Sequence, residues 1–503
     1  MNRTWRILAF AGILTGIAGL VTSQATVWAL QAKNGPVVAV ASLVRDKTPG
    51  RVAHWLVEHV GHADKPLLLT GTTVFVLLVC AWVGTSALKY PLLSDIVYVV
   101  LAVIGLLAVI RLHDSTAGSA FGVLVGLITW IVVHRALTGL LAGSGTETTD
   151  AVRRMFLRRA GAVAFLVAGA GVLGGLSSRG RRRVEQARRL LRLPGGPGSV
   201  PVGANLGAPD IAPWRTPNND FYLIDTAFTK PTIVPSEWRL RIHGLVDTPI
   251  TLTYDDLVSR AFVHEWITLC CVSNKVGGDL VGNAFWSGVL IRDVLAEVGI
   301  QAGADAVLQT SHDGWTCGTP LSALTDPDRN AMLALAMNGR PLPVEHGFPV
   351  RMVVPGLYGY VSATKWLTDL EVTTFDTFQA YWTQEGWSEK GPIKTESRID
   401  VPGSHGHTAV GTVSVGGVAW AQHTGIDHVE FQLDGGSWQR ATLGTVPGND
   451  TWVQWAGQVD VAEGDHTLVV RATDKSGYTQ TAVKTDVLPN GATGWHTVPF
   501  SAH

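Results

Sequence analysis

Hydrophobic residues are concentrated in the first third of the chain, in long uninterrupted runs. Five apolar segments precede residue 178, approximately at Trp5–Leu30, Leu67–Leu88, Leu93–Ile110, Ala117–Leu141 and Ala160–Leu176. Each approaches or exceeds the ~20 residues that a helix needs to cross the hydrocarbon core of a bilayer. Buried helices of soluble proteins seldom run this long without a polar face. The pattern therefore predicts an all-α transmembrane bundle of about five helices over residues 1–177.

A cluster of arginines directly precedes the fifth apolar segment. Arg153–Arg159 reads RRMFLRR, which resembles a twin-arginine export signal, although any basic cluster there would also anchor an ordinary span on the cytoplasmic side. Under both interpretations the residues after 178 lie outside the cytoplasm, so we expect a multi-pass protein of the plasma membrane. The basic segment Ser178–Arg192 opposes this orientation, unless it forms an amphipathic helix along anionic headgroups.

Beyond the apolar segments the pattern of polar and apolar residues changes. A Gly/Pro-rich linker, Pro194–Pro209, completes a connecting region over residues 178–209. In residues 210–380 two periodicities mix: Trp238–Val246 alternates like a strand, whereas Trp286–Val298 has the spacing of a helix. This mixture predicts an α+β domain that is large enough for its own core.

Residues 390–500 show a third pattern, in which short segments alternate between polar and apolar residues. Short alternating runs such as TVSVGGVAWA and HVEFQLDGG are separated by turn signals, among them Asp434-Gly435-Gly436. Regular short strands with such turns predict an immunoglobulin-like β-sandwich.

Net charge and cysteine content limit the possible partners and metal sites of the chain. The net charge is -1, so no overall basic field indicates a nucleic-acid partner. The chain has only four cysteines and no CxxC, and two of them, Cys270 and Cys271, are adjacent in the stretch TLCCVSNKVGG. The residues alone leave three explanations open for this pair: simple packing, a disulfide to Cys317, or a transition-metal ligand. A single thiolate holds neither an iron–sulfur cluster nor a structural zinc, so a metal at Cys271 needs further ligands from a cofactor.

Several motifs in a fixed order favour the third explanation. They are the stretch CVSNKVGG that begins at Cys271, WSGVLIRDVL at Trp286–Leu295, HGFPVR at His346–Arg351, and SATKW at Ser362–Trp366. Together they resemble the sulfite oxidase family of molybdenum-cofactor enzymes. The resemblance covers residues 210–375 and extends into residues 390–500, which resemble the family's dimerisation domain and so imply a homodimer.

This resemblance implies a site for molybdenum–molybdopterin. Cys271 corresponds to the family's molybdenum ligand, with Cys270 as its buried apolar neighbour. The other implied cofactor-binding residues are Asn274, His346, Arg351, Ser362, Thr364 and Lys365. Lys275 and Trp315 occupy positions that the family uses in catalysis, although Lys275 replaces the usual arginine and Trp315 stands where the family has its active-site tyrosine.

The departures from the family pattern concern the substrate. Family members that oxidise sulfite use arginines beside the molybdenum, but Phe221–Phe228 contains neither Arg nor His, and Val276 stands at another of these positions. Desolvating a small dianion without paired cations is costly. We therefore expect oxo transfer with a sulfoxide or another small oxide. Sulfite oxidation proper, or a non-catalytic membrane-anchored binding module, remain the alternatives.

Histidines in the apolar segments bear on whether the bundle binds haem and carries electrons. The apolar segments contain only His134, with His113 at a segment edge, whereas a bis-histidine haem needs two ligands that face each other. We therefore expect no haem in the bundle, and we expect an unidentified electron-transfer partner instead.

Overall fold

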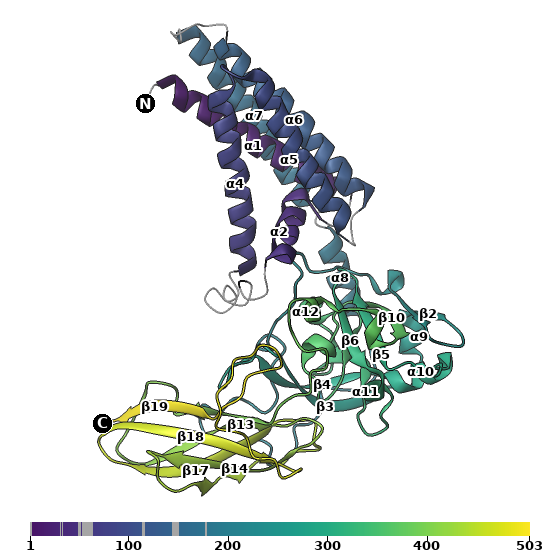
Figure 1. The fold of residues 1–503 in the computed structure, drawn as a ribbon, viewed down its shortest axis with the longest axis vertical. Coiled ribbons are helices and arrows are strands. Elements are labelled where there is room, and N and C mark those ends of the chain that lie inside the picture. Colours follow the sequence, from purple (N-terminus) through teal and green to yellow (C-terminus); the bar gives the residue numbers. More distant parts are fainter. Residues whose placement is uncertain are drawn as a thin grey trace. The chain divides into compact units, whose positions relative to one another are not determined.

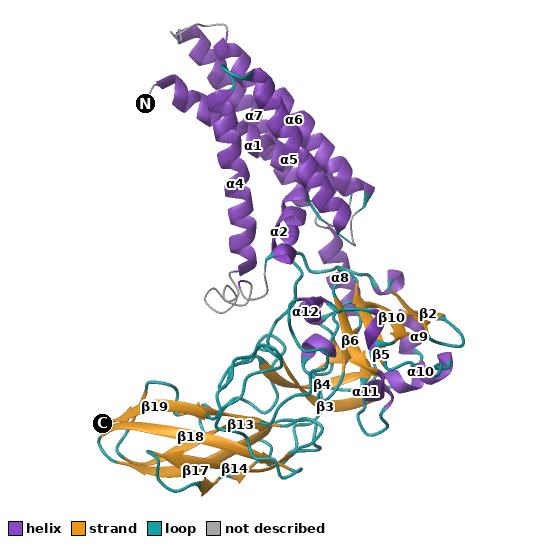
Figure 2. Ribbon diagram, in the orientation of Figure 1, coloured by secondary structure: helices purple, strands orange, loops and turns teal. Residues whose placement is uncertain are grey.

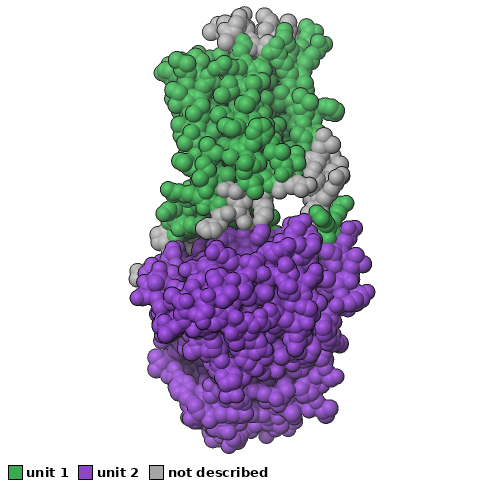
Figure 3. Space-filling view, turned by 90° about the vertical axis from the view of Figure 1, so that its right-hand side faces the viewer, with its two compact units in different colours: residues 1–184, 227–230 green, residues 185–226, 231–503 purple. Residues whose placement is uncertain are grey.

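The structure, a computed structural model, describes residues 3–30, 32, 34–48, 52, 64–112, 116–142, 150–176 and 179–503 (Figure 1). These residues form two compact units, which Figure 3 colours separately. One unit comprises residues 1–184 with 227–230, and the other comprises residues 185–226 with 231–503. The first unit is helical, whereas strands dominate the second (Figure 2).

The helical unit contains the expected apolar segments. Its elements are α1 (Arg3–Ala29), α2 (Pro36–Lys47), α4 (Asp64–Ser86), α5 (Pro91–Arg111), α6 (Ala117–Ala142) and α7 (Asp150–Leu176). Within the described residues, four helices are long and apolar enough to cross a membrane: α1, α4, α5 and α6. The fifth expected segment and the RRMFLRR motif both lie in the helix α7, and the short helix α2 was not predicted.

Small residues and one polar pair determine how this bundle packs. A Cβ atom on Gly12 would lie 2.1 Å from Cys80 O, so only glycine permits this close approach of α1 to α4. His134 is buried, and its Nδ1 lies 3.2 Å from the hydroxyl of Tyr98. This buried histidine of an apolar helix thus has a polar partner on α5. His113 lies outside the described residues.

The boundary between the two units falls inside the helix α8, and the two sheets of the α+β region follow it in the chain. A five-stranded sheet has the order β2-β1-β10-β5-β6, and β3-β4-β7-β8 form another sheet, with β9 paired to β7. The elements are α8 (Arg179–Leu190), β1 (Arg239–Gly244), β2 (Ile250–Thr253), α9 (Tyr254–Val258), β3 (Val263–Cys270), β4 (Val281–Leu290), α10 (Ile291–Val298), β5 (Ala306–Ser311), β6 (Thr316–Pro320), α11 (Leu321–Thr325), β7 (Met332–Met337), β8 (Arg340–Pro341), β9 (Arg351–Val353), β10 (Leu367–Thr373) and α12 (Tyr381–Gln384). The predicted strand at Trp238–Val246 is confirmed as β1.

The prediction of a helix over Trp286–Val298 is wrong for its first five residues. Residues 286–290 complete the strand β4, and the helix α10 starts only at Ile291. These residues pair with β3 on one side and β7 on the other. A Cβ atom on Gly288 would lie 2.0 Å from Leu333 O, so glycine permits the close strand contact there. Long-range pairing overrides the local helical spacing.

The C-terminal β region, residues 396–503, consists of two sheets around one hydrophobic core. Their orders are β11-β13-β17-β16 and β12-β19-β18-β14-β15. The core includes Val415, Trp455 and Val470. The strands are β11 (Glu396–Val401), β12 (Gly406–Thr408), β13 (Gly411–Trp420), β14 (Ile426–Leu433), β15 (Gln439–Arg440), β16 (Thr442–Leu443), β17 (Val453–Val461), β18 (Gly464–Asp474) and β19 (His496–Ala502). The alternating strands are confirmed, and the immunoglobulin-like topology stays a prediction.

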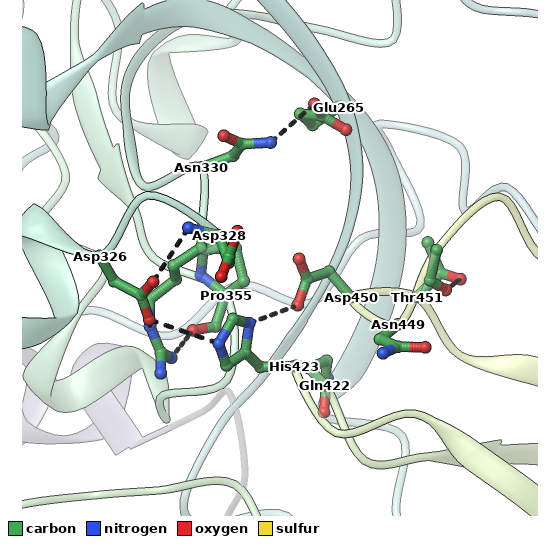
Figure 4. A network of polar contacts seen from close by, with 12 residues as sticks. Glu265, Asp326, Asp328, Asn330, Pro355, Gln422, His423, Asn449, Asp450 and Thr451 are labelled. Atoms are coloured by element: carbon green, nitrogen blue, oxygen red, sulfur yellow. Dashed lines mark hydrogen bonds and ion pairs between the residues drawn. The ribbon is translucent and has the colours of Figure 1, made fainter. Parts of the chain in front are cut away.

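Polar contacts join the C-terminal β region to the α+β region. Figure 4 shows His423 between two carboxylates, with its Nε2 3.5 Å from Asp326 Oδ2 and its Nδ1 3.6 Å from Asp450 Oδ1. Trp214 and Trp452 each donate an indole N–H to the other's carbonyl oxygen, at 3.1 and 2.8 Å. The two regions of this unit are therefore joined by specific buried contacts as well as by the chain.

Candidate active site

A cavity of about 100 Å³ in the second unit has the Cys271 side chain in its wall. Seven of the other lining residues are aromatic, namely Phe221, Tyr222, Trp315, Tyr360, Trp366, Trp382 and Trp387. Arg351 and Lys365 also line the cavity. Four of the residues predicted from the sequence, namely Cys271, Trp315, Arg351 and Lys365, are thus brought together although they are up to 94 positions apart in the chain (365 − 271).

Cys271 directly follows β3 and starts a closed loop. Its backbone N–H donates to Leu280 O at 2.9 Å, and its own carbonyl accepts from Asn274 N at 3.0 Å. The side-chain oxygen of Asn274 accepts from Leu280 N at 2.8 Å. Asn274, predicted to bind the cofactor, therefore shapes the loop that presents Cys271.

Two opposing effects act on the pKa of the Cys271 thiol. Burial raises its pKa, because a thiolate loses solvation there. Hydrogen bonds from the backbone and hydroxyl of Ser273, together with the positive charge of Lys365, act in the opposite direction. These donors favour the thiolate that a metal ligand requires.

Arg351 is a buried cation with an unusual set of partners. Its side chain donates to three backbone carbonyls, those of Met352, His346 and Ala363, at 3.2–3.3 Å. No carboxylate pairs with it in the described part of the chain, and only 4% of it is exposed. Burial accordingly lowers its pKa to about 10. A buried guanidinium without a counter-ion fits an anionic group such as the phosphate of a pterin cofactor.

Lys365 differs from Arg351, because its charge is already balanced. Its Nζ donates to Asp225 Oδ2 at 3.0 Å, and both side chains are less than a tenth exposed. The charged side chains of the cavity wall are Asp225, Asp313, Arg351 and Lys365. Two cations thus face two carboxylates, so the cavity has no excess of positive charge.

The other predicted residues lie outside the cavity wall. Lys275 is exposed. Ser362 donates its hydroxyl to Tyr358 O, and the Thr364 hydroxyl lies 3.2 Å from the sulfur of Cys317. These contacts favour a supporting role for Ser362 and Thr364. All four cysteines are free thiols, so the disulfide alternative is not realised.

His346, another residue predicted to bind the cofactor, has one ring nitrogen without a hydrogen-bond partner. Its Nε2 donates to Asn218 O at 2.9 Å, whereas its buried Nδ1 has no hydrogen-bond partner. Burial lowers its pKa to about 4, so the ring is neutral at pH 7 and Nδ1 is an acceptor. The unpartnered buried Nδ1 is compatible with a donor group of a bound cofactor.

Several site residues were not identified from the sequence. Tyr222 and Asp225 lie in Phe221–Phe228, the stretch that lacks the family's Arg and His, and Trp382 and Trp387 lie beyond the expected domain end at residue 380. An unusual density of tryptophan around residues 382–387 was the only signal available.

A buried carboxyl from the C-terminal β region interacts with Asn274 and Cys270, beside the loop that begins at Cys271. Glu396, on β11, is 4% exposed, and its pKa is raised to about 8 by burial, a shift that Lys394 and Asn274 partly oppose. Burial raises the pKa of Cys270, and the ionised form of Glu396 would raise it further. At neutral pH the Glu396 carboxyl is therefore largely protonated.

We expect the Glu396→Gln variant to change how stability depends on pH. The folded protein holds this proton up to about pH 8, whereas the unfolded chain releases it near pH 4.5, so the free energy of unfolding falls as pH rises through that window. The total decrease is on the order of several kcal/mol. Thermal unfolding of both proteins from pH 5 to 9 should show a smaller decline in the variant; parallel curves would contradict the assignment.

Comparisons with known proteins match this part of the chain to molybdopterin enzymes. Residues 227–382 match the family model "Oxidoreductase molybdopterin binding domain". The chain is 33% identical over 156 residues to the uncharacterized oxidoreductase YuiH of Bacillus subtilis (strain 168), covering 31% of this chain and 75% of that protein. It is 29% identical over 311 residues to the mitochondrial sulfite oxidase of Macaca fascicularis, covering 52% of this chain and 56% of that protein.

The solved structure of the sulfane dehydrogenase SoxCD from Paracoccus pantotrophus shares the fold, with a TM-score of 0.50 and 23% identity. That likeness covers 57% of this chain and 81% of the other. The chain spans only about half the length of the sulfite oxidase that it matches.

The chain belongs to the sulfite oxidase family of molybdopterin-dependent oxidoreductases. Its implied cofactor is molybdenum–molybdopterin, and the residues fit this group. A thiol beside donors, a buried guanidinium without a counter-ion, and an unpartnered His346 Nδ1 supply a soft metal ligand, an anion-binding cation and an acceptor.

Proposed function

We propose that the chain is a membrane-anchored molybdenum oxidoreductase whose substrate is a small neutral oxide, such as a sulfoxide. The observation that carries the substrate class is the charge balance of the aromatic cavity beside Cys271. Sulfite would need surplus cations there to replace its hydration, whereas Lys365 is already paired with Asp225. A neutral sulfoxide places an apolar body against aromatic rings and needs only one or two hydrogen-bond donors.

The residues of this chain have distinct tasks in this proposal. Cys271 is the protein's ligand to molybdenum, and the cofactor supplies two-electron oxo transfer when it is bound. Arg351 binds the anionic part of the cofactor. Trp315 and the other aromatic side chains exclude water and orient the substrate. Lys365 donates to a substrate oxygen and orients it. The carboxylate of Asp225 balances the charge of Lys365.

The proposal also assigns a location and partners. Four apolar helices support anchoring in a membrane, and the basic motif at the start of α7 favours an active domain outside the cytoplasm. Electrons come from an unidentified partner, and the C-terminal β region is the candidate surface for a homodimer. Labelling single introduced cysteines with a membrane-impermeant reagent in intact cells tests the side: a cysteine at exposed Val202 should react.

The substrate class is tested with the full-length protein purified with its cofactor. We expect reduction of dimethyl sulfoxide or methionine sulfoxide with reduced viologen to have a higher kcat/KM than oxidation of sulfite with ferricyanide, by at least about tenfold, or ~1.4 kcal/mol. Faster sulfite oxidation would contradict the neutral-substrate proposal and favour a sulfite oxidase proper. Neither activity, in protein that contains molybdenum, would favour a binding module.

A further inference from the structure

The strand that leads to Cys271 is anchored by the C-terminal β region. Thr268, fully buried on β3, makes three hydrogen bonds with that region. Its backbone N–H donates to Asp450 O at 2.9 Å, its hydroxyl accepts from Trp452 N at 2.8 Å, and its carbonyl accepts from the side chain of Gln422 at 3.1 Å. Gln422 and Asp450 are both visible in Figure 4. One end of the cysteine segment is therefore fixed from outside the α+β region.

The other end of the same segment is also held by the C-terminal β region. Arg398 on β11 donates from Nη1 to Gly278 O at 3.0 Å, and its Nε lies 2.6 Å from Asp400 Oδ1. The imidazole of His496 packs against Gly277, where a Cβ atom would lie 2.1 Å from Nε2. Gly277 has a φ of +78°, a conformation that favours glycine, so two features of this residue restrict it to glycine.

The ion pair that orients Arg398 is itself well fixed. Both side chains are 11% exposed, and the second oxygen of Asp400 accepts a hydrogen bond from the backbone of Ala212 at 3.0 Å. Arg398 therefore keeps one direction, with a donor aimed at Gly278 O. A guanidinium can bridge a carboxylate and a carbonyl in this way because its donors form a rigid fork.

We propose that Arg398, in the C-terminal β region, is a positioning residue that sets the orientation of the Cys271 thiol. This inference rests on the proposed role of Cys271 as molybdenum ligand. The hydrogen bonds inside the loop between Cys271 and Leu280 determine its shape, but only external contacts determine where the loop points. Loss of a group that orients a metal ligand typically costs about 10–100-fold in metal affinity or activity.

The test uses the full-length protein and two variants of Arg398. Arg398→Lys keeps the charge beside Asp400 but lacks the fork that also reaches Gly278 O, and Arg398→Met removes both contacts. Arg471→Met is the matched control, because Arg471 lies in the same β region and pairs with Glu430, 2.9 Å from its Nε. The primary readout is the electron paramagnetic resonance spectrum of the half-reduced molybdenum, which reports on the orientation of the sulfur ligand.

We expect both Arg398 variants to shift this spectrum and to lower kcat by about 10–100-fold, with KM changed much less. In cofactor-free protein, the alkylation rate of Cys271 by iodoacetamide should change about threefold or more, since thiol reactivity follows its surroundings. Arg471→Met should match the wild type in all three measurements. Spectra and alkylation rates of both Arg398 variants that equal those of the control would overturn the proposal.

A separate control distinguishes this inference from the proposed function. If Cys271→Ser leaves the wild-type spectrum unchanged, the ligand assignment fails and the role of Arg398 fails with it. If Cys271→Ser alters the spectrum but the Arg398 variants do not, only the positioning role fails. If Arg398→Met does not fold, Arg398→Lys, which retains the ion pair with Asp400, decides the outcome.

Discussion

Replacing Cys271 by serine will lower oxo-transfer activity by more than ~100-fold, the upper range for loss of groups that merely support a metal ligand. Serine occupies nearly the same volume, so the loop closed by Cys271 N and Leu280 O remains. The hydroxyl, however, is a much weaker and harder ligand than a thiolate. The measurement is steady-state activity with reduced viologen, alongside the circular dichroism spectrum and the unfolding midpoint.

Cys270 and Cys317 provide matched controls for this prediction. Both are fully buried free thiols in the same region, but neither lines the cavity. Cys270→Ser should lose stability, by roughly 1–3 kcal/mol for a buried hydroxyl without a good partner. Cys317→Ser should lose less, because the Thr364 hydroxyl beside the sulfur can pair with the serine. Both variants should retain the activity of the folded fraction. Equal loss of activity in all three variants would show that Cys271 has no special role.

Replacing Arg351 by lysine will release the cofactor during purification. Lysine retains a positive charge but cannot donate to three carbonyls and bind an anion with a planar fork. Hydrogen bonds to charged groups contribute about 1.5–3 kcal/mol each, so we expect cofactor retention to fall by roughly one to two orders of magnitude. Pterin fluorescence after oxidative release from the purified protein measures this directly.

Arg292→Lys is the control for this second prediction. Arg292 is a partly exposed arginine of the same region and donates to Pro327 O and to the Asn330 side chain. It does not line the cavity, so its variant should retain the pterin of the wild type. Unchanged pterin content in Arg351→Lys would remove Arg351 from the cofactor site.

The sequence predicted those features that depend on local order. The apolar helices and the alternating strands after residue 390 both arise from patterns within a few consecutive residues. The cluster of Cys271, Arg351 and Lys365 followed from the family motifs, since their order along the chain is characteristic even though their spacing is long.

What the sequence did not predict depends on contacts between distant segments. Residues 286–290 have helical spacing but are a strand, because β3 and β7 pair with both edges. Asp225 could not be matched to Lys365 by inspection, since 140 residues separate them. The same reason hides Glu396 and Arg398, whose significance appears only when β11 lies beside the cysteine loop.

The central claim is that this chain holds molybdenum–molybdopterin at Cys271. The most direct measurement is metal and pterin analysis of the full-length protein, purified from the membranes of a host that synthesises the cofactor, beside Cys271→Ala. We predict equimolar molybdenum and pterin in the wild type, and an altered molybdenum spectrum with loss of metal-centred activity in the variant. A folded wild type that contains neither molybdenum nor pterin would contradict the account.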